Sequence, residues 1–197
     1  MKDRDIRIIL MAELNRRYTK DANTLVMEEF GVKNGAARID LVVVNHVIHG
    51  YEIKSDLDSL SRLPEQVRVF SSVVDLMTLV IGYRHAYNAL KIVPEWWGVR
   101  LAEKKERGGV VLTSARLPHS NPAVNLQAVV ALLWRDEALN ILEKMGAADG
   151  VRSKARTEIY RRLVQISEPD YLRSMIRQQL RSRKEWRVGV RYKSYGD

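Results

Sequence analysis

The sequence predicts an α/β fold, in which a mixed β-sheet is flanked by helices and followed by a C-terminal helical extension. Up to residue 115, apolar patterns succeed one another as helix, three strands, helix, strand, helix and two further strands. The run 75–83 is almost continuously apolar, as a central strand covered on both faces requires. Only helical patterns follow the Pro-containing segment 117–122. We therefore predict a core over residues 1–118 and a basic helical region over 119–197.

The first helix is expected from about Lys2 to Tyr18. Its apolar residues recur at helical spacing, and they are Ile6, Ile9, Leu10 and Leu14. Glu13 falls on this apolar stripe, where a carboxylate is costly without a partner. Residues 24–30 then form the first strand. Glu28 and Glu29 should point to opposite faces of it, so that at most one approaches a site on the sheet.

The segment 37–56 has the pattern of a β-hairpin. Two apolar stretches rich in Val and Ile are separated by a polar dipeptide at 45–46. Each strand carries charge that a buried strand normally avoids: Asp40 on the first, and Glu52 with Lys54 on the second. Because residues two apart in a strand share a face, Glu52 and Lys54 point the same way.

The loop length decides whether Asp40 joins them. A two-residue loop would pair residue 40 with residue 51 and turn Asp40 to the face opposite Glu52. A three-residue loop over 45–47, or one bulge, pairs Asp40 with Glu52 and brings the two carboxylates side by side. We predict the second register. Two carboxylates and the Lys54 ammonium on one face would be stabilised by a divalent cation between them.

Pro64 is tolerated in the first turn of a helix, so a helix should follow the hairpin and carry Gln66 one turn before Phe70. The remaining elements of the core are this helix over 64–74, a strand over 75–83, a helix over 84–93 and a final hairpin of strands 97–102 and 109–115.

The hairpin residues resemble the signature of the PD-(D/E)xK nuclease superfamily, which has the restriction-endonuclease-like fold. That signature is an acidic residue on one strand followed by E-x-K on the next, here Asp40 and then Glu52-Ile53-Lys54. Ile39 stands where the family commonly has proline. The resemblance covers roughly residues 1–115 and is closest to small bacterial and phage-borne members. It implies a Mg²⁺-dependent nuclease, a hydrolase that cuts phosphodiester bonds, with DNA as the expected substrate.

The resemblance also implies roles for these residues. Asp40, Glu52 and the carbonyl of Ile53 would hold Mg²⁺, with Mn²⁺ as a substitute, through oxygen ligands that suit a hard cation. Lys54 would stabilise the developing charge or orient the nucleophile.

Two further residues join this expected site. An acidic residue of the first helix often assists in the superfamily, and Glu13 matches it, although Glu13 could instead reach solvent or pair with an arginine. Gln66 and Phe70 are similar to a Q-x-x-x-Y element of exonuclease-like members, in which Gln orients the site. Phe70 lacks the tyrosine hydroxyl, and Gln66 could equally be a plain surface residue.

Composition and missing motifs exclude several classes of protein. The chain has 197 residues, is 46% hydrophobic and contains no cysteine, so it supports a core but no disulfide or thiolate metal site. No signal peptide or membrane span is visible, and we expect a cytoplasmic protein. The motifs of a zinc site, a nucleophile elbow or a nucleotide-binding loop are not present, so we expect no bound nucleotide cofactor.

Positive charge gathers toward the C-terminus. Residues 1–150 carry 20 Lys and Arg against 19 Asp and Glu, whereas residues 151–197 carry 13 against 5. Such a tail favours a polyanionic partner, nucleic acid ahead of a membrane surface, although a well-solvated basic surface would look the same.

Three helices are expected in the helical region, over about 122–145, 153–167 and 169–186. The first two, with the Gly-bounded loop between them, are similar to SAP-like helix–loop–helix DNA-binding modules, and a plain helical bundle is the alternative. In the SAP-like interpretation Ser153 caps the second helix. Four cations could then meet phosphates, namely Lys154, Arg156, Arg161 and Arg162.

Two other functions compete with the nuclease. A nuclease-fold protein could bind DNA or a partner as an accessory factor without cutting. Alternatively, Asp40, Glu52 and Lys54 could form a structural salt-bridge cluster in an interaction module, since buried ion networks imitate active sites. A homodimer is an option in the nuclease interpretation, because two-strand cleavage by a small domain commonly uses two copies.

Overall fold

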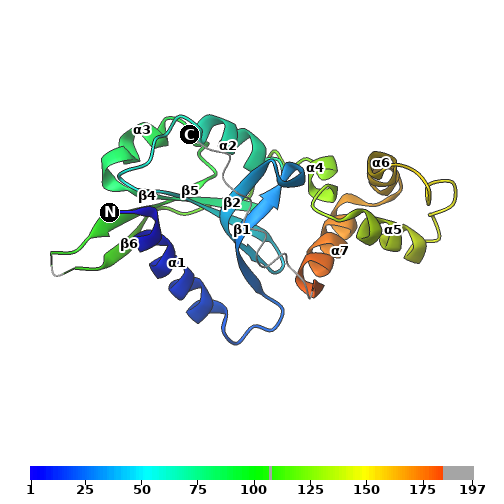
Figure 1. Ribbon diagram of the computed structural model, residues 1–197, viewed down its shortest axis with the longest axis horizontal. Coiled ribbons are helices and arrows are strands. Elements are labelled where there is room, and N and C mark those ends of the chain that lie inside the picture. Colours follow the sequence, from blue (N-terminus) through cyan, green and yellow to red (C-terminus); the bar gives the residue numbers. More distant parts are fainter. Residues whose placement is uncertain (107, 184–197) are drawn as a thin grey trace.

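The computed structural model describes residues 1–106 and 108–183, and its centre is a six-stranded mixed sheet (Figure 1). The strands are β1 (Leu25–Val32), β2 (Ala37–Val44), β3 (Ile48–Lys54), β4 (Leu76–Gly82), β5 (Gly98–Lys104) and β6 (Val110–Arg116). They lie in the sheet in chain order. The first three strands form an antiparallel meander, β3, β4 and β5 are parallel, and β6 is antiparallel to β5. The predicted mixed sheet is confirmed.

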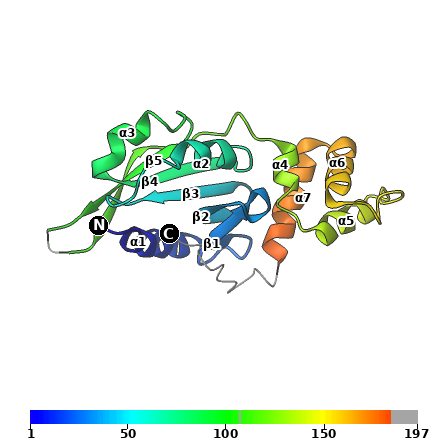
Figure 2. The ribbon, with the colours of Figure 1, turned by 45° about the horizontal axis from the view of Figure 1, so that its top comes forward.

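Helices cover both faces of this sheet (Figure 2). They are α1 (Asp3–Tyr18), α2 (Leu63–Phe70), α3 (Ala86–Leu90), α4 (Leu126–Val130), α5 (Arg135–Lys144), α6 (Arg156–Ile166) and α7 (Pro169–Ser182), with 3₁₀ turns η1 (Lys33–Gly35) and η2 (Tyr83–His85). Helix α1 lies under one face, α2 and α3 lie on the other, and α4 to α7 gather at one end of the sheet. None of the helices in the described ranges has the length and apolar character needed to span a bilayer.

The two faces of the sheet bury separate apolar clusters. On the α1 face, Ile6, Leu10 and Leu14 pack with sheet residues such as Tyr51 and Ile53. Three of the four residues predicted for the stripe of the first helix are therefore confirmed, and the fourth, Ile9, is half-buried outside this cluster. On the other face, one cluster runs without a break from the sheet into α4 to α7. The helical region thus shares its core with the sheet, and the division at residue 118 stays a prediction.

The helical region differs from its predicted outline. The single helix expected over 122–145 is two helices, because the chain turns between α4 and α5. There the Glu137 carboxylate accepts the N–H of Trp134 at 2.7 Å and caps the first turn of α5. Ser153 does not cap the next helix, since α6 starts only after Ala155. The last helix is described to Ser182, and its expected end near Trp186 lies outside the described residues.

Helix α7 is fixed to the sheet by arginines that meet Asp75 at the start of β4. Asp75 is buried, accepts the N–H of Ile48 at 2.6 Å and forms an ion pair with Arg173, while Arg177 lies 3.9 Å away. One turn further along α7, Arg181 donates to the Asn45 carbonyl in the β2–β3 turn at 2.5 Å. This face of α7 is therefore a docking surface within the protein.

Replacing Asp75 by alanine should lower the free energy of unfolding by about 2–3 kcal/mol, because Arg173 and the Ile48 N–H would lose their common acceptor. Urea denaturation measures the change. Asp170→Ala is the matched control, since Asp170 is exposed and lies 3.5 Å from the same arginine. That variant should cost under about 0.5 kcal/mol. Equal losses in the two variants would contradict the assignment.

Candidate functional site

The β2–β3 turn sets the positions of the charged hairpin residues. Leu41 pairs with Tyr51, so Asp40 is level with Glu52. The turn is closed by the Asn45 N–H, which donates to the Val47 carbonyl at 3.0 Å. This is the three-residue loop, and the predicted register is confirmed.

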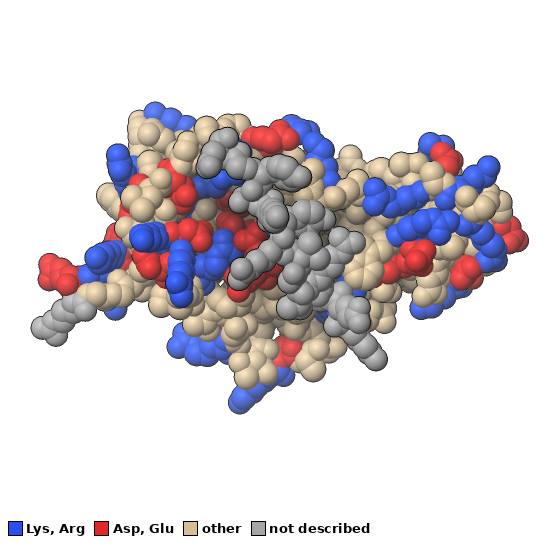
Figure 3. Space-filling model, in the orientation of Figure 1, with Lys and Arg blue, Asp and Glu red and all other residues tan. Residues whose placement is uncertain are grey.

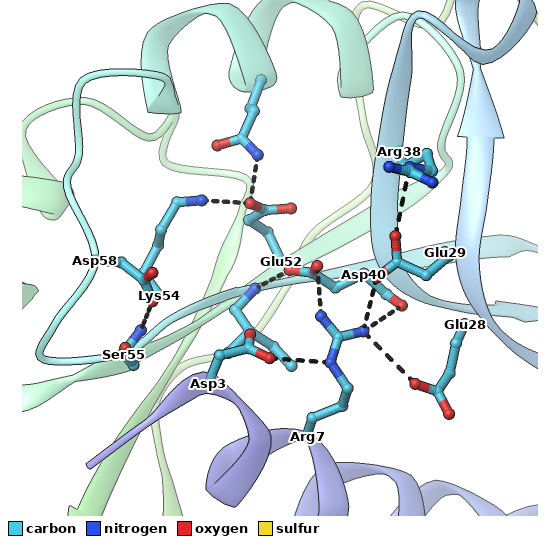
Figure 4. A network of polar contacts seen from close by, with 12 residues as sticks. Asp3, Arg7, Glu28, Glu29, Arg38, Asp40, Glu52, Lys54, Ser55 and Asp58 are labelled. Carbon is cyan, nitrogen blue, oxygen red and sulfur yellow. Dashed lines mark hydrogen bonds and ion pairs between the residues drawn. The ribbon is translucent and has the colours of Figure 1, made fainter. Parts of the chain in front are cut away.

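Glu52 lies in a sealed polar cluster between β3 and α2 (Figure 4). It is 2% exposed, and its Oε1 accepts hydrogen bonds from Lys54 Nζ at 2.6 Å and Gln66 Nε2 at 2.5 Å. Within the described residues, Glu52 Oε2 and Gln66 Oε1 have no hydrogen-bond partner. Burial raises the pKa of Glu52 to about 8, and the nearby Asp40 charge adds to this effect; together they outweigh Lys54 and Gln66, which act in the opposite direction.

Asp40 turns toward helix α1. Its Oδ1 accepts a hydrogen bond from Arg7 at 2.8 Å, and its Oδ2 accepts the backbone N–H of Ile53 at 2.7 Å. Burial alone would lower the pKa of Arg7, but the hydrogen bond to Asp3 and the charge of Asp40 outweigh it and raise this pKa. Asp40 and Glu52 are therefore neighbours held by different cations.

Sequence reasoning missed Arg7, although a signal for it exists. Arg7, Leu10 and Leu14 stand at i, i+3 and i+7, so this arginine follows the buried stripe of α1 as Glu13 does. A cation on a buried stripe needs a carboxylate from the facing sheet, and Asp40 supplies it.

Glu28 and Glu29 both approach this network, against the expectation that at most one could. They lie 3.6 and 3.2 Å from Arg7, and Arg38 lies 3.4 Å from Glu29. The reason is a local irregularity in β1: Glu29 has a φ of 52°, which breaks the alternation of side chains along the strand.

Glu13 lies elsewhere. It forms an ion pair of 2.7 Å with Arg100 on β5, which is the arginine pairing that the sequence left open for it. The structure thus joins Glu52, Lys54 and Gln66 by hydrogen bonds, and it leaves Glu13 out. Asp40 is near enough for its charge to act on Glu52, but it turns toward α1 while Glu52 faces α2, so the two carboxylates do not share one face as predicted. Ile53 contributes its N–H to Asp40.

The chemistry of the cluster is charge neutralisation by the protein itself. Arg7 neutralises Asp40, and Lys54 lies against Glu52. Across residues 1–106 and 108–183, no group of three or more His, Cys, Asp or Glu side chains is placed to hold a metal ion. Binding of Mg²⁺ or Mn²⁺ at Asp40 and Glu52 stays an untested prediction.

Fold and site together define a mixed α/β protein with a buried, internally ion-paired hairpin and an attached basic helical region. A family model described as Bacteriophage P4 protein cII matches residues 1–188, and the chain belongs to this family. Protein cII of Enterobacteria phage P4 is 30% identical over 99 residues, which are 50% of this chain and 37% of that protein. The match therefore spans little more than a third of the relative's length.

This family membership corrects the functional prediction. The chain is assigned to the P4 cII family and not to the PD-(D/E)xK superfamily, so the predictions of a nuclease, of a hydrolase and of a metal-dependent enzyme are wrong. The structure gives the physical reason why the resemblance misled. The signature residues occur at the expected spacing, but their carboxyl groups contact other side chains of the protein. Asp40 contacts Arg7, and Glu52 contacts Lys54 and Gln66.

Stability should fall as the pH rises from about 5 to about 8, with a slope of up to about 1.4 kcal/mol per pH unit. Glu52 has a pKa of about 8 in the folded chain against an ordinary value of 4.5, so in this window the folded state holds a proton that the unfolded state has lost. The stability that this proton contributes to the folded state is fully present below pH 4.5 and is lost as the pH approaches about 8.

Urea denaturation at several pH values measures this slope. Glu52→Gln should flatten it, because glutamine stays neutral throughout. The control Glu103→Gln changes an exposed residue of β5 and should leave the slope unchanged. A wild-type slope that persists in Glu52→Gln would show that another group carries it.

Proposed function

We propose that this chain is a nucleic-acid-binding accessory protein that holds duplex DNA by its phosphates and does not cut it. The supporting observation is three exposed cations on α6 and the loop before it, which we call the α6 surface: Lys154, Arg156 and Arg162. Within the described residues, none of the three forms an ion pair with a carboxylate. Arg161 beside them is exposed as well, and it pairs with Glu158 at 2.8 Å.

The loop before α6, which carries Lys154, is held in place. Arg135 on α5 donates to the backbone carbonyls of Arg152 and Lys154, at 2.6 and 3.3 Å. Arg156 lies with its guanidinium 5.9 Å from the centre of the Tyr160 ring. A fixed loop loses less conformational entropy when it meets a phosphate backbone. Figure 3 shows Lys and Arg side chains over this helical end of the molecule.

The arginines of α7 and the one just after it are engaged internally. Arg173, Arg177 and Arg181 face the sheet, and Arg183 pairs with Glu137 at 2.5 Å. The excess of positive charge after residue 150 is therefore not one uniform tail. Within residues 151–183 it includes arginines that dock α7, and cations on α6 and the loop before it that remain available to a partner.

The α5–loop–α6 unit keeps the helix–loop–helix form predicted from the sequence. Leu142, Ile159 and Leu163 are fully buried and Leu139 is half-buried. The same core continues into α4 and α7, so the unit is part of a larger helical region. The likeness to SAP modules stays a prediction, and it would agree with contacts to phosphates that are independent of sequence.

We also propose that the sheet is restriction-endonuclease-like in architecture alone. The order of elements supports this proposal: helix α1, the meander β1–β3, the crossover helix α2 and the parallel strand β4. We also propose that the protein works in the cytoplasm, where a chain without cysteine needs no oxidising environment.

The triple variant Lys154→Ala/Arg156→Ala/Arg162→Ala should bind duplex DNA at least about tenfold more weakly than the wild type. It should also lower the slope of log affinity against log salt by about 2–3, because three phosphate contacts are lost. Fluorescence anisotropy between about 50 and 200 mM salt measures both. Point variants are preferable to removing residues 151–197, which would also remove the buried Leu172 and Ile176.

The matched control is Lys20→Ala/Lys104→Ala/Lys105→Ala, which removes three exposed cations from other parts of the surface. It should change the affinity by less than about threefold. Equal losses in the two triple variants, or an unchanged salt slope in the first, would refute the role of the α6 surface.

A further inference from the structure

Turn η2 and helix α3 present exposed aromatic side chains to solvent. Tyr83 is 68% exposed and Tyr87 is 73% exposed, and Leu90 beside them is 44% exposed. Ala89 and Val93 face inward and are buried, so the segment is packed on the protein by its other side. Large apolar side chains that gather on one exposed surface commonly mark a binding site.

The charged side chains of this segment itself are positive, and the Asp56 carboxylate lies behind it, against Gly82. Arg84 and Lys91 are exposed, and the sequence has no Asp or Glu from Gly82 to Pro94. The Lys91 ammonium lies 4.1 Å from the centre of the Tyr87 ring, which places a cation over one face of this ring. We call Tyr83, Arg84, Tyr87, Leu90 and Lys91 the α3 surface.

We propose that the α3 surface binds single-stranded nucleic acid, with Tyr83 and Tyr87 stacking on unpaired bases and Arg84 and Lys91 meeting the flanking phosphates. Aromatic rings set among cations are the chemistry that such strands require, because every base has a π-face and every linkage a negative charge. A second copy of the chain fits this surface poorly, since an isologous contact would bring like charges together.

The platform is rigid enough to receive a base. The chain just before α3 is anchored where His85 Nε2 lies 3.2 Å from the Asp56 carbonyl oxygen, and Ala89 is fully buried. In both ribbon views α3 and α6 lie at opposite ends of the molecule (Figures 1 and 2). The α3 surface is thus separate from the proposed duplex surface, goes beyond it and does not depend on it.

The test uses the full chain and three probes of equal length: an oligothymidine of about 15 nucleotides, an abasic strand and a duplex. Fluorescence anisotropy should show that Tyr83→Ala and Tyr87→Ala each weaken oligothymidine binding at least about fivefold. Tyr87→Phe keeps the ring and should stay within about twofold. Tyr171→Ala, the control at another exposed tyrosine, should also stay within about twofold.

The abasic strand separates stacking from charge. The abasic strand should bind more weakly than oligothymidine, and its affinity should be unchanged by either tyrosine variant. Arg84→Ala and Lys91→Ala should lower the affinity for both strands. Duplex binding should be unaffected by the tyrosine variants and reduced by the α6 triple variant. A failure of one proposal is therefore distinguishable from a failure of the other.

Three results would overturn the inference. The first is oligothymidine binding that is unchanged in Tyr83→Ala and Tyr87→Ala. The second is a loss of binding in Tyr87→Phe as large as that in Tyr87→Ala. The third is a wild-type protein that sediments as a dimer and tyrosine variants that sediment as monomers but still bind oligothymidine. The last result would assign the α3 surface to a second copy of the chain.

Discussion

Two carboxylates in or beside the central strands, those of Asp40 and Asp75, are each held by an arginine from a helix, and the positions of α1 and α7 depend on this pairing. Arg7 of α1 meets Asp40, and Arg173 of α7 meets Asp75. The Glu52 carboxylate lies against Lys54 of its own strand. An ion removed from water costs several kcal/mol unless it is compensated, so a helix that brings the compensating charge has a defined place. Apolar packing brings α1 and α7 to the sheet, and the ion pairs of Arg7 and Arg173 determine the position of each helix on it.

Much of the fold could be predicted from local patterns. The spacing of Ile6, Leu10 and Leu14 predicted α1 correctly, and alternation with a short polar turn predicted the β2–β3 hairpin. The register was chosen between two loop lengths because it pairs Asp40 with Glu52, and it is confirmed. The break between α4 and α5 was missed, because Trp134 and Glu137 continue a helical pattern while their contact caps a new helix. Such a cap depends on the direction of one side chain, which periodicity does not encode.

The candidate site shows a different limit. Strand alternation correctly placed Lys54 beside Glu52, and the helix after the hairpin brings Gln66 to the same carboxylate, whereas Asp40 is level with Glu52 but turns toward α1. The sequence did not reveal where the neutralising charge comes from. An acidic pair on neighbouring strands can be compensated by a bound ion or by basic side chains, and only the position of Arg7 distinguishes the two. The family assignment then showed that the catalytic interpretation of these residues was wrong.

The contact between Asp75 and Arg173 has a consequence for how the chain is made. These residues are 98 positions apart, and the helix that carries the arginine is among the last described elements to leave the ribosome. Until then, the nascent sheet has a carboxylate at the start of β4 without its counter-charge, and one apolar surface without the leucines of α7. Burial of this surface of the sheet therefore waits until α7 has been synthesised, and a chain cut before α7 would expose the surface to aggregation.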